Sequence, residues 1–171
     1  MVITKIEAQK KKGRYNIYLN DAFAFGVDEA TVVKYALFKG TELTKEQIEE
    51  IQHDDCIQQA YQKALHFLNF KLRSTKEVYE KLEKLEFDED IINEVLGKLH
   101  EQNFINDTFY AESYLNQAKF VTFKGPKSVI FDLQKKGISD KVIQTVLEGY
   151  TLREQLENAI QIAQSYLKGE K

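Results

Sequence analysis

The sequence has few of the residues that interrupt helices or form disulfides, and it lacks the long apolar runs of membrane-spanning segments. Its 171 residues include one proline, eight glycines, one cysteine and no tryptophan. Few prolines and glycines favour helices over turn-rich β folds. A single cysteine, Cys56, cannot form an internal disulfide, and no apolar run approaches the ~20 residues of a membrane span. The N-terminus also lacks the basic and apolar segments of a signal peptide. We therefore expect a cytoplasmic protein without membrane contacts.

The composition that remains is that of an ordered globular chain. Hydrophobic residues make up 43% and aromatic residues 12%, enough to build a core. The 24 basic and 27 acidic residues nearly balance, with a net charge of −3. A protein built mainly to coat nucleic acid is expected to be basic, so the charge argues against that class.

An internal repeat organises most of the chain. The segment Ser74–Leu96 returns 51 positions later as Gly125–Leu147. Ser74 falls on Gly125 and Asp88 on Ser139, and both pairs suit helix N-caps. The coincident apolar positions have helical spacing: Val78 and Val129, Leu82 and Leu133, Ile92 and Ile143, Val95 and Val146, Leu96 and Leu147. The repeat predicts tandem helical units.

The residues before the repeat have a different periodicity. Alternating apolar residues predict three short strands, Val2–Ala8, Arg14–Asn20 and Ala22–Val27, in an antiparallel meander. The polar segment Gln9–Gly13 suits the first hairpin loop.

Two helices should follow these strands. Asp28 is placed to cap a helix to about Leu37 that Gly40 ends, and Thr44 with Gln47 forms a capping-box pattern for the second.

Each repeat is expected to be a three-helix unit. In the first, the helices cover about Asp55–Asn69, a segment from Ser74 with Glu77 as its capping partner, and Asp88–Gln102. The second begins near Asp107.

Its next two helices are marked by single residues. Pro126 suits the first position of one helix, Gly137 ends it and Ser139 starts the next. Leu152–Leu167 resembles the first helix of a third unit. An unfinished unit would leave an apolar face exposed, so we expect either a shortened chain or a helix that caps the second unit.

The predicted fold is therefore mainly α: tandem three-helix repeats in an elongated curved stack, preceded by a small N-terminal region of three antiparallel strands plus helix. The expected domains are residues 1–52, residues 53–105, residues 106–150 and residues 151–171.

No residue pattern indicates catalysis. The cluster His53–Cys56 is the densest group of metal-ligand types, but four adjacent residues rarely converge on one ion, so we interpret it as a helix start capped by Asp54 or Asp55. No glycine-rich phosphate-binding loop occurs. We predict a protein that is not an enzyme, with no catalytic residues, metal or cofactor.

Basic residues recur through the repeat. Arg73 overlays Lys124, and Lys76 overlays Lys127, at the starts of corresponding helices. Positive charge is mildly unfavourable at a helix N-terminus, so helix stability does not explain these cations. They could contact a polyanion or an acidic protein groove, although solvated surface lysines remain the alternative. The candidate contact residues are Lys71, Arg73, Lys76, Lys119, Lys124 and Lys127.

Three nearby aromatic residues have two possible roles. Phe70, Phe120 and Phe123 could form a docking surface, and a core position is the interpretation we favour for all three.

The order of short motifs resembles the RecX family of bacterial regulators. The shared pattern includes Leu72-Arg73-Ser74 in the first unit and Phe104-Ile105-Asn106-Asp107 between the units. Lys124-Gly125-Pro126 with Lys136-Gly137-Ile138 resembles the family's middle repeat. The resemblance covers about Ile57 to Leu167, and the strands resemble the N-terminal extension of longer members.

The resemblance implies a non-enzymatic modulator that binds RecA filaments along their groove. It would hinder ATP hydrolysis, filament growth and strand exchange, in DNA recombination, repair and the SOS response. Single- or double-stranded DNA is a further implied contact, and we expect a monomer. Arg73 and Lys124 fall on basic positions of the family. The alternative is a helical DNA-binding module that acts without RecA.

Overall fold

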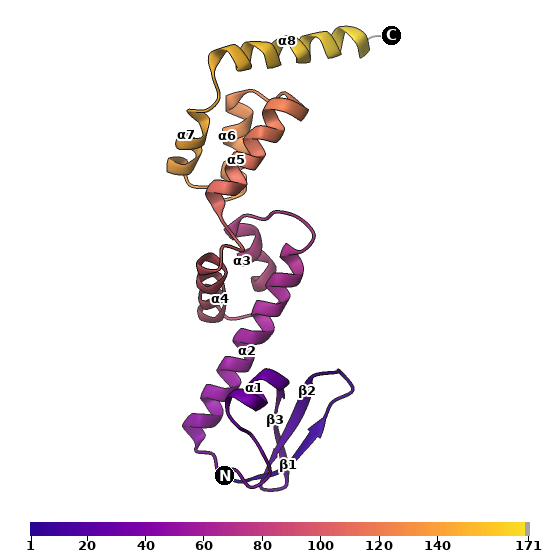
Figure 1. The fold of residues 1–171 in the computed structure, drawn as a ribbon, viewed down its shortest axis with the longest axis vertical. Helices are drawn as coiled ribbons and strands as arrows, with labels where there is room; N and C mark the ends of the chain where they lie inside the picture. The colour runs from indigo at the N-terminus through magenta and orange to yellow at the C-terminus, as the bar shows by residue number, and fades with distance from the viewer. Residues whose placement is uncertain (170–171) are drawn as a thin grey trace. The chain divides into compact units, whose positions relative to one another are not determined.

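The computed structural model describes residues 1–169, which form two compact units dividing between Gln62 and Lys63. The first unit combines a small sheet with helices, and the second is helical (Figure 1). The division falls inside one helix, α2 (Lys45–Leu68). The expected boundary at residue 53 lies within the same helix.

A three-stranded antiparallel sheet forms the first unit's framework, as predicted. Strands β1 (Ile3–Ala8), β2 (Arg14–Leu19) and β3 (Ala22–Asp28) lie in the order β1-β2-β3. Ile17 pairs with Ile6 on one side and with Phe25 on the other. Apolar residues of the sheet pack with those of the following segments in one core: Ile3, Ile17, Leu19, Phe25, Val27, Leu37, Leu43 and Ile51.

Helix α1 (Glu29–Lys34) starts where the sequence predicts. The Asp28 carboxylate accepts a hydrogen bond of 2.7 Å from the Thr31 amide. The helix ends before Leu37 rather than including it, because Ala36 takes a left-handed conformation with φ 46° and the Leu37 amide bonds back to the Val32 carbonyl. This turn buries the Leu37 side chain in the core.

Helix α2 is one helix where two were expected. Thr44 and Gln47 form the predicted capping box, with hydrogen bonds of 2.9 and 3.2 Å. The prediction that Asp54 or Asp55 caps a new helix is wrong: both lie inside α2. No glycine or proline interrupts the segment, and the two carboxylates bond to other elements instead.

Asp55 holds the sheet and α2 together through a buried ion pair. Both guanidinium nitrogens of Arg14 donate to its carboxylate, at 3.0 and 3.2 Å, and the Arg14 side chain also bonds to the Gly26 carbonyl. The same carboxylate accepts the Asp28 amide at 2.7 Å and the Gln59 amide group at 2.8 Å. Its side chain is 4% exposed, so these bonds satisfy a charge that would otherwise be costly to bury.

The second unit contains the remaining helices (Figure 1). They are α3 (Thr75–Glu83), α4 (Glu89–Glu101), α5 (Asp107–Gln117), the π-helix η1 (Ala118–Thr122), α6 (Pro126–Lys135), α7 (Asp140–Leu147) and α8 (Leu152–Gly169). The last residues of the expected 151–171 segment, 170 and 171, lie outside the described residues. The predicted start of α6 at Pro126 and the end after it at Gly137 are confirmed.

The repeat positions form the helical cores. The apolar residues of α3 and α4 that recur at the repeat spacing are buried: Val78, Leu82, Ile92, Val95 and Leu96. Their counterparts Val129, Leu133, Ile143 and Val146 belong to one core with α5. The π-helix η1, which extends α5 toward α6, had no expected equivalent in the sequence.

The two repeats meet through the N-terminus of α3. Ser74 and Glu77 form the predicted capping box, and the Ser74 hydroxyl also donates to the Lys136 carbonyl at 2.7 Å. Glu77 accepts from the Lys136 ammonium at 2.8 Å. Gly137 has φ 77°, and a Cβ added there would lie 2.7 Å from the Lys76 side chain. The turn after α6 is therefore fitted closely against the start of α3.

We predict opposite effects for one substitution at two glycines. Gly137→Ala should lower the free energy of unfolding by about 1–3 kcal/mol, because alanine is strained at a positive φ and its methyl group meets Lys76. Gly97→Ala, inside α4 with open space around the added methyl, should raise it by about 0.5–1 kcal/mol. Urea unfolding followed by circular dichroism measures both. A stabilised Gly137→Ala would contradict the described junction.

We also predict that Asp55→Ala destabilises the first unit by about 3–5 kcal/mol, because it leaves the Arg14 charge buried without its partner. The matched control is Glu49→Ala, which removes an exposed partner of Lys45 and should change stability by less than about 1 kcal/mol. Hydrogen exchange of the β2 and β3 amides reports the loss for this unit alone. Equal protection in the two variants would refute the role of the buried pair.

Candidate partner-binding surface

Arg73 is a packing residue of the first repeat. Its guanidinium lies over the Phe67 ring, 3.9 Å from the centroid, and 3.6 Å from the Glu77 carboxylate. The side chain is 16% exposed. Burial opposes the ionised form of Glu77, but the Lys136 ammonium, the Ser74 amide and the Arg73 charge together lower its pKa below the ordinary value. The fold therefore uses the Arg73 charge internally.

Lys124, the repeat counterpart of Arg73, also has an internal carboxylate partner. Its ammonium is 2.7 Å from Asp132 and 3.1 Å from the Tyr114 hydroxyl, which itself donates to Asp132. The hydrogen bond to Asp132 and that to Tyr114 raise the pKa of Lys124, and the same lysine lowers the pKa of Asp132. Nearby carboxylates therefore offset both helix-start charges, so the fold itself uses the two cations.

Lys119 fastens η1 to α8. Its ammonium lies 2.5 Å from the Glu154 carboxylate and donates to the Gly149 carbonyl at 2.9 Å, with a side chain 10% exposed. The Lys119 hydrogen bond, followed by those from Thr151, lowers the pKa of Glu154 to about 2. The pair is ionised at neutral pH and holds the start of α8.

Lys76 is more exposed but also bonds within the unit. Its ammonium donates to the Lys135 carbonyl at 3.3 Å and lies 3.7 Å from Glu80. Four of the six candidate residues thus have internal partners: Arg73, Lys76, Lys119 and Lys124.

Lys71 and Lys127 are the candidates whose charges point to solvent. Both are exposed, and within residues 1–169 neither forms an ion pair. Lys71 precedes α3, and Lys127 lies in the first turn of α6, so each sits at the start of the second helix of its repeat.

Large apolar side chains are exposed next to Lys71 and in the segment before α6. Phe70 is 72% exposed and Phe120 68%, so the expectation that both belong to the core is wrong; Phe123 is half-buried. Val121, the repeat counterpart of Phe70, is 66% exposed. Both segments lie outside the regular helical period, because one is a loop and the other is the π-helix that redirects the end of α5.

We call this set the paired-segment surface: Phe70, Lys71 and Leu72 before α3, with Phe120, Val121 and Lys127 before and at the start of α6. The sequence indicates this surface only weakly. Phe70 and Phe120 each stand next to a lysine and outside any run of apolar residues. Solvent-exposed aromatic residues with cationic neighbours are typical of protein-binding surfaces.

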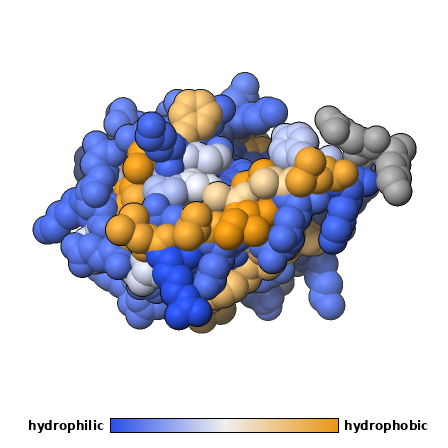
Figure 2. Space-filling model, turned by 90° about the horizontal axis from the view of Figure 1, so that it is seen from above, coloured by the Kyte–Doolittle hydropathy of each residue, from blue (hydrophilic) through white to orange (hydrophobic). Residues whose placement is uncertain are grey.

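Helix α8 is attached by polar bonds on one side and exposes apolar residues on the other. Asn158 is buried and donates to the Tyr150 hydroxyl at 2.7 Å, which in turn bonds to the Lys124 carbonyl at 2.9 Å. An apolar strip crosses the face shown in Figure 2, and the exposed apolar residues of α8 are Leu152, Leu156, Ile160, Tyr166 and Leu167. These apolar residues of α8 are therefore uncovered in the part of the chain that the structure describes.

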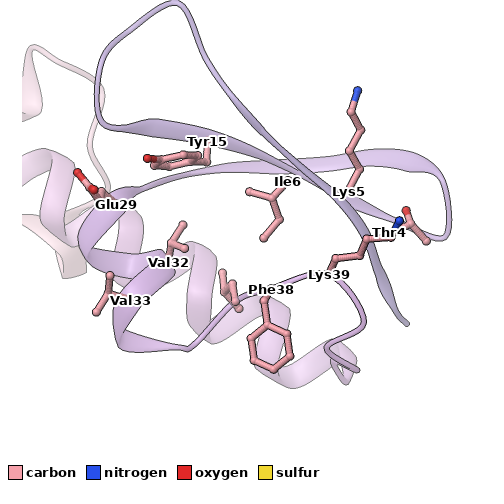
Figure 3. A pocket seen from close by; sticks show the side chains of 10 residues that line it. Thr4, Lys5, Ile6, Tyr15, Glu29, Val32, Val33, Phe38 and Lys39 are labelled. Atoms are coloured by element: carbon pink, nitrogen blue, oxygen red, sulfur yellow. The ribbon is translucent and has the colours of Figure 1, made fainter.

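The first unit has an open groove of about 510 Å³ between the sheet and α1. Tyr15, Ile6 and Val32 point into it, and Phe38 lies at its edge (Figure 3). The lining is mostly apolar, and the charged residues Lys5, Glu29 and Lys39 also border the groove.

Two kinds of feature are absent from residues 1–169. No three His, Cys, Asp or Glu side chains converge there as metal ligands. None of the helices described is long and apolar enough to cross a membrane.

Comparison with known families gives two matches along the chain. Residues 1–44 match the regulatory protein RecX N-terminal domain, and residues 60–99 match the first three-helix domain of RecX.

Curated relatives and solved structures extend the similarity to nearly the whole chain. Regulatory protein RecX of Leuconostoc mesenteroides is 45% identical over 94% of this chain, and that of Listeria welshimeri is 38% identical over 98%. This chain spans 60% and 63% of their lengths. A crystal structure of regulatory protein RecX superposes with a TM-score of 0.79 at 37% identity, covering 96% of this chain and 81% of the other. RecX from Lactobacillus salivarius gives 0.62 at 39% identity, covering 66% and 73%.

We predict an acid-labile attachment of α8. The lowered pKa of Glu154 means that its stabilising contribution is complete above the ordinary value of 4.5 and is lost as the pH falls toward about 2. An NMR titration of the Glu154 carboxyl should therefore have its midpoint near 2, and Lys119→Met should move it upward. Lys141→Met is the control and should leave the midpoint unchanged. A midpoint near 4.5 in the unaltered chain would contradict the pairing.

Proposed function

Since the chain belongs to the RecX family of regulatory proteins, we propose that it binds filaments of the RecA recombinase along their groove and inhibits them. Binding there would slow ATP hydrolysis, filament growth and strand exchange in recombination and DNA repair. A family of regulatory proteins fits a sequence without a catalytic motif. In this proposal the chain acts by occupying a surface of its partner and not by transforming a substrate.

The repeated exposure of apolar residues carries this proposal. Phe70 and Val121 occupy equivalent repeat positions and are both more than 60% exposed, although a soluble fold gains nothing from exposing them. A filament presents the same protein surface at regular intervals. Two equivalent apolar contacts in one chain suit such a partner, since each can meet an equivalent site on successive protomers.

The exposed lysines complement this apolar surface. Lys71 and Lys127 have no carboxylate partner among the described residues, so they can pair with acidic groups of the RecA groove. Such rim charges chiefly accelerate association and set its salt dependence. Arg73 and Lys124 contribute to the surface indirectly, because their ion pairs hold the helix starts next to the exposed segments.

The charge distribution favours a protein partner for the second unit over DNA alone. Four of the six candidate cations are offset by internal partners, and the whole chain carries a net charge of −3. A module that bound DNA by itself through these helices would need most of those charges free.

The test is inhibition of RecA ATP hydrolysis on single-stranded DNA by the full chain. We expect the double variant Phe70→Ser, Phe120→Ser to need at least roughly 30-fold more protein for half-inhibition, because buried aromatic contacts at interfaces contribute about 2 kcal/mol or more. The matched control is Phe23→Ser, which removes a phenylalanine 60% exposed in the first unit and should inhibit normally.

A charge-reversal pair tests the rim independently. Lys71→Glu with Lys127→Glu should weaken inhibition most at low salt and least at high salt. Unchanged inhibition by both double variants would remove the paired-segment surface as the contact. Absence of any inhibition by the unaltered chain at large excess would count against RecA regulation by this chain.

A further inference from the structure

The loop between β1 and β2 carries three consecutive lysines, Lys10, Lys11 and Lys12, all exposed. No ion pair neutralises any of them within residues 1–169. The chain has no other run of three cations. Like charges placed side by side repel one another, so the run does not stabilise the hairpin, for which Asn or Gly would be the usual residues.

The loop is held in a fixed conformation. The Gln9 amide donates to the Arg14 carbonyl at 2.8 Å, and the Arg14 amide donates back to the Lys11 carbonyl at 3.2 Å. Gly13 has φ 78°, which permits this tight return. The Glu29 amide donates to the Gly13 carbonyl at 3.0 Å, so the loop is also tied to the start of α1.

The buried Asp55 network anchors the loop at its base. Arg14 follows the lysine run by two residues, and its bidentate bond to Asp55 fixes the first residue of β2 against α2. A cationic loop on a rigid support loses little conformational entropy on binding, apart from that of the lysine side chains. The support therefore favours a site that contacts a ligand.

The acidic groups around the loop are mostly engaged elsewhere. Glu7 pairs with Lys5 and accepts from the Tyr18 hydroxyl, and Asp28 caps α1. Glu29, in the first turn of α1, is the remaining carboxylate next to the loop through its backbone bond to Gly13. The local field of the loop is consequently positive.

We propose that Lys10, Lys11 and Lys12 form a contact site for the phosphate backbone of a nucleic acid. Three adjacent ammonium groups are suited to a ligand with repeated, closely spaced negative charges. A membrane surface fits less well, because the segment from Gln9 to Gly13 contains no apolar side chain to insert and only three cations.

The site lies in the first unit and is separate from the paired-segment surface of the second. It rests on the proposed function in one respect: a regulator of RecA filaments works beside DNA, which supplies the ligand. In this proposal the second unit contacts protein and the first unit contacts nucleic acid. The basic loop, and not the repeat cations, becomes the chain's DNA contact.

The experiment measures binding of the full chain to fluorescein-labelled oligothymidine, and to a duplex of equal length, over a series of salt concentrations without RecA. The test variant is the triple Lys10→Gln, Lys11→Gln, Lys12→Gln. The matched control is Lys39→Gln, Lys45→Gln, Lys63→Gln, which removes the same charge from exposed positions elsewhere. We expect the test variant to lower the slope of log K against log salt by about 2 on single strands, at roughly 0.7 per contact, with at least about tenfold weaker binding at low salt.

The control triple should bind like the unaltered chain, and Glu29→Gln should bind slightly tighter because it removes the carboxylate beside the loop. Equal slopes and affinities for the two triples would overturn the proposal, as would absence of DNA binding by the unaltered chain at low salt. Sedimentation with anionic phospholipid vesicles provides the remaining arm. Lysine-loop-dependent vesicle binding without loop-dependent DNA binding would also overturn it, in favour of a lipid surface.

A RecA assay with the same variants separates this proposal from the proposed function. A test triple that loses DNA binding and still slows ATP hydrolysis supports both. Loop-dependent DNA binding by a chain that leaves RecA unaffected supports the nucleic-acid site and refutes RecA regulation.

Discussion

The second unit depends on one carboxylate at the start of α3. Glu77 closes the capping box with Ser74, offsets the charge of Arg73 and accepts the Lys136 ammonium of the following repeat at 2.8 Å. One partly buried group thus fixes a helix start, the cation–π packing on Phe67 and the contact between repeats. Its pKa is lowered overall, so the carboxylate is ionised at neutral pH and these contacts coexist. Because a buried charge of this kind is costly without partners, its neighbours cannot be exchanged freely.

This constraint changes which cations are available to a partner. A positive charge that recurs at the same place in two repeats suggests a function when only the sequence is known. In the structure, Glu77 and Asp132 give Arg73 and Lys124 structural roles. Of the six candidate cations, Lys71 and Lys127 are the two without a carboxylate partner within residues 1–169, and the lysine loop of the first unit has none there either. The exposed phenylalanines next to Lys71 and before α6 are the reason why we propose a protein-binding surface there.

The fold could be predicted from the sequence to the extent that local signals determine it. Alternating apolar residues located the three strands, capping residues such as Ser74 and Pro126 located helix starts, and the 51-residue repeat located the cores. The errors came from tertiary contacts. Asp55 looked like a cap because its partner, Arg14, is 41 residues away, and Phe120 looked like a core residue because nothing local announces a π-helix. The internal partners of the candidate cations, such as Glu154 for Lys119, could be recognised only in three dimensions.

We propose that the second unit contacts RecA through the segments before α3 and α6. Hydrogen–deuterium exchange of the chain, free and bound to RecA filaments on single-stranded DNA, tests it most directly. We predict added protection of the backbone around residues 69–73 and 118–124, with little change in α4, whose amides are already protected in the free chain. Protection confined to other segments, with these two left as exposed as in the free chain, would contradict the account.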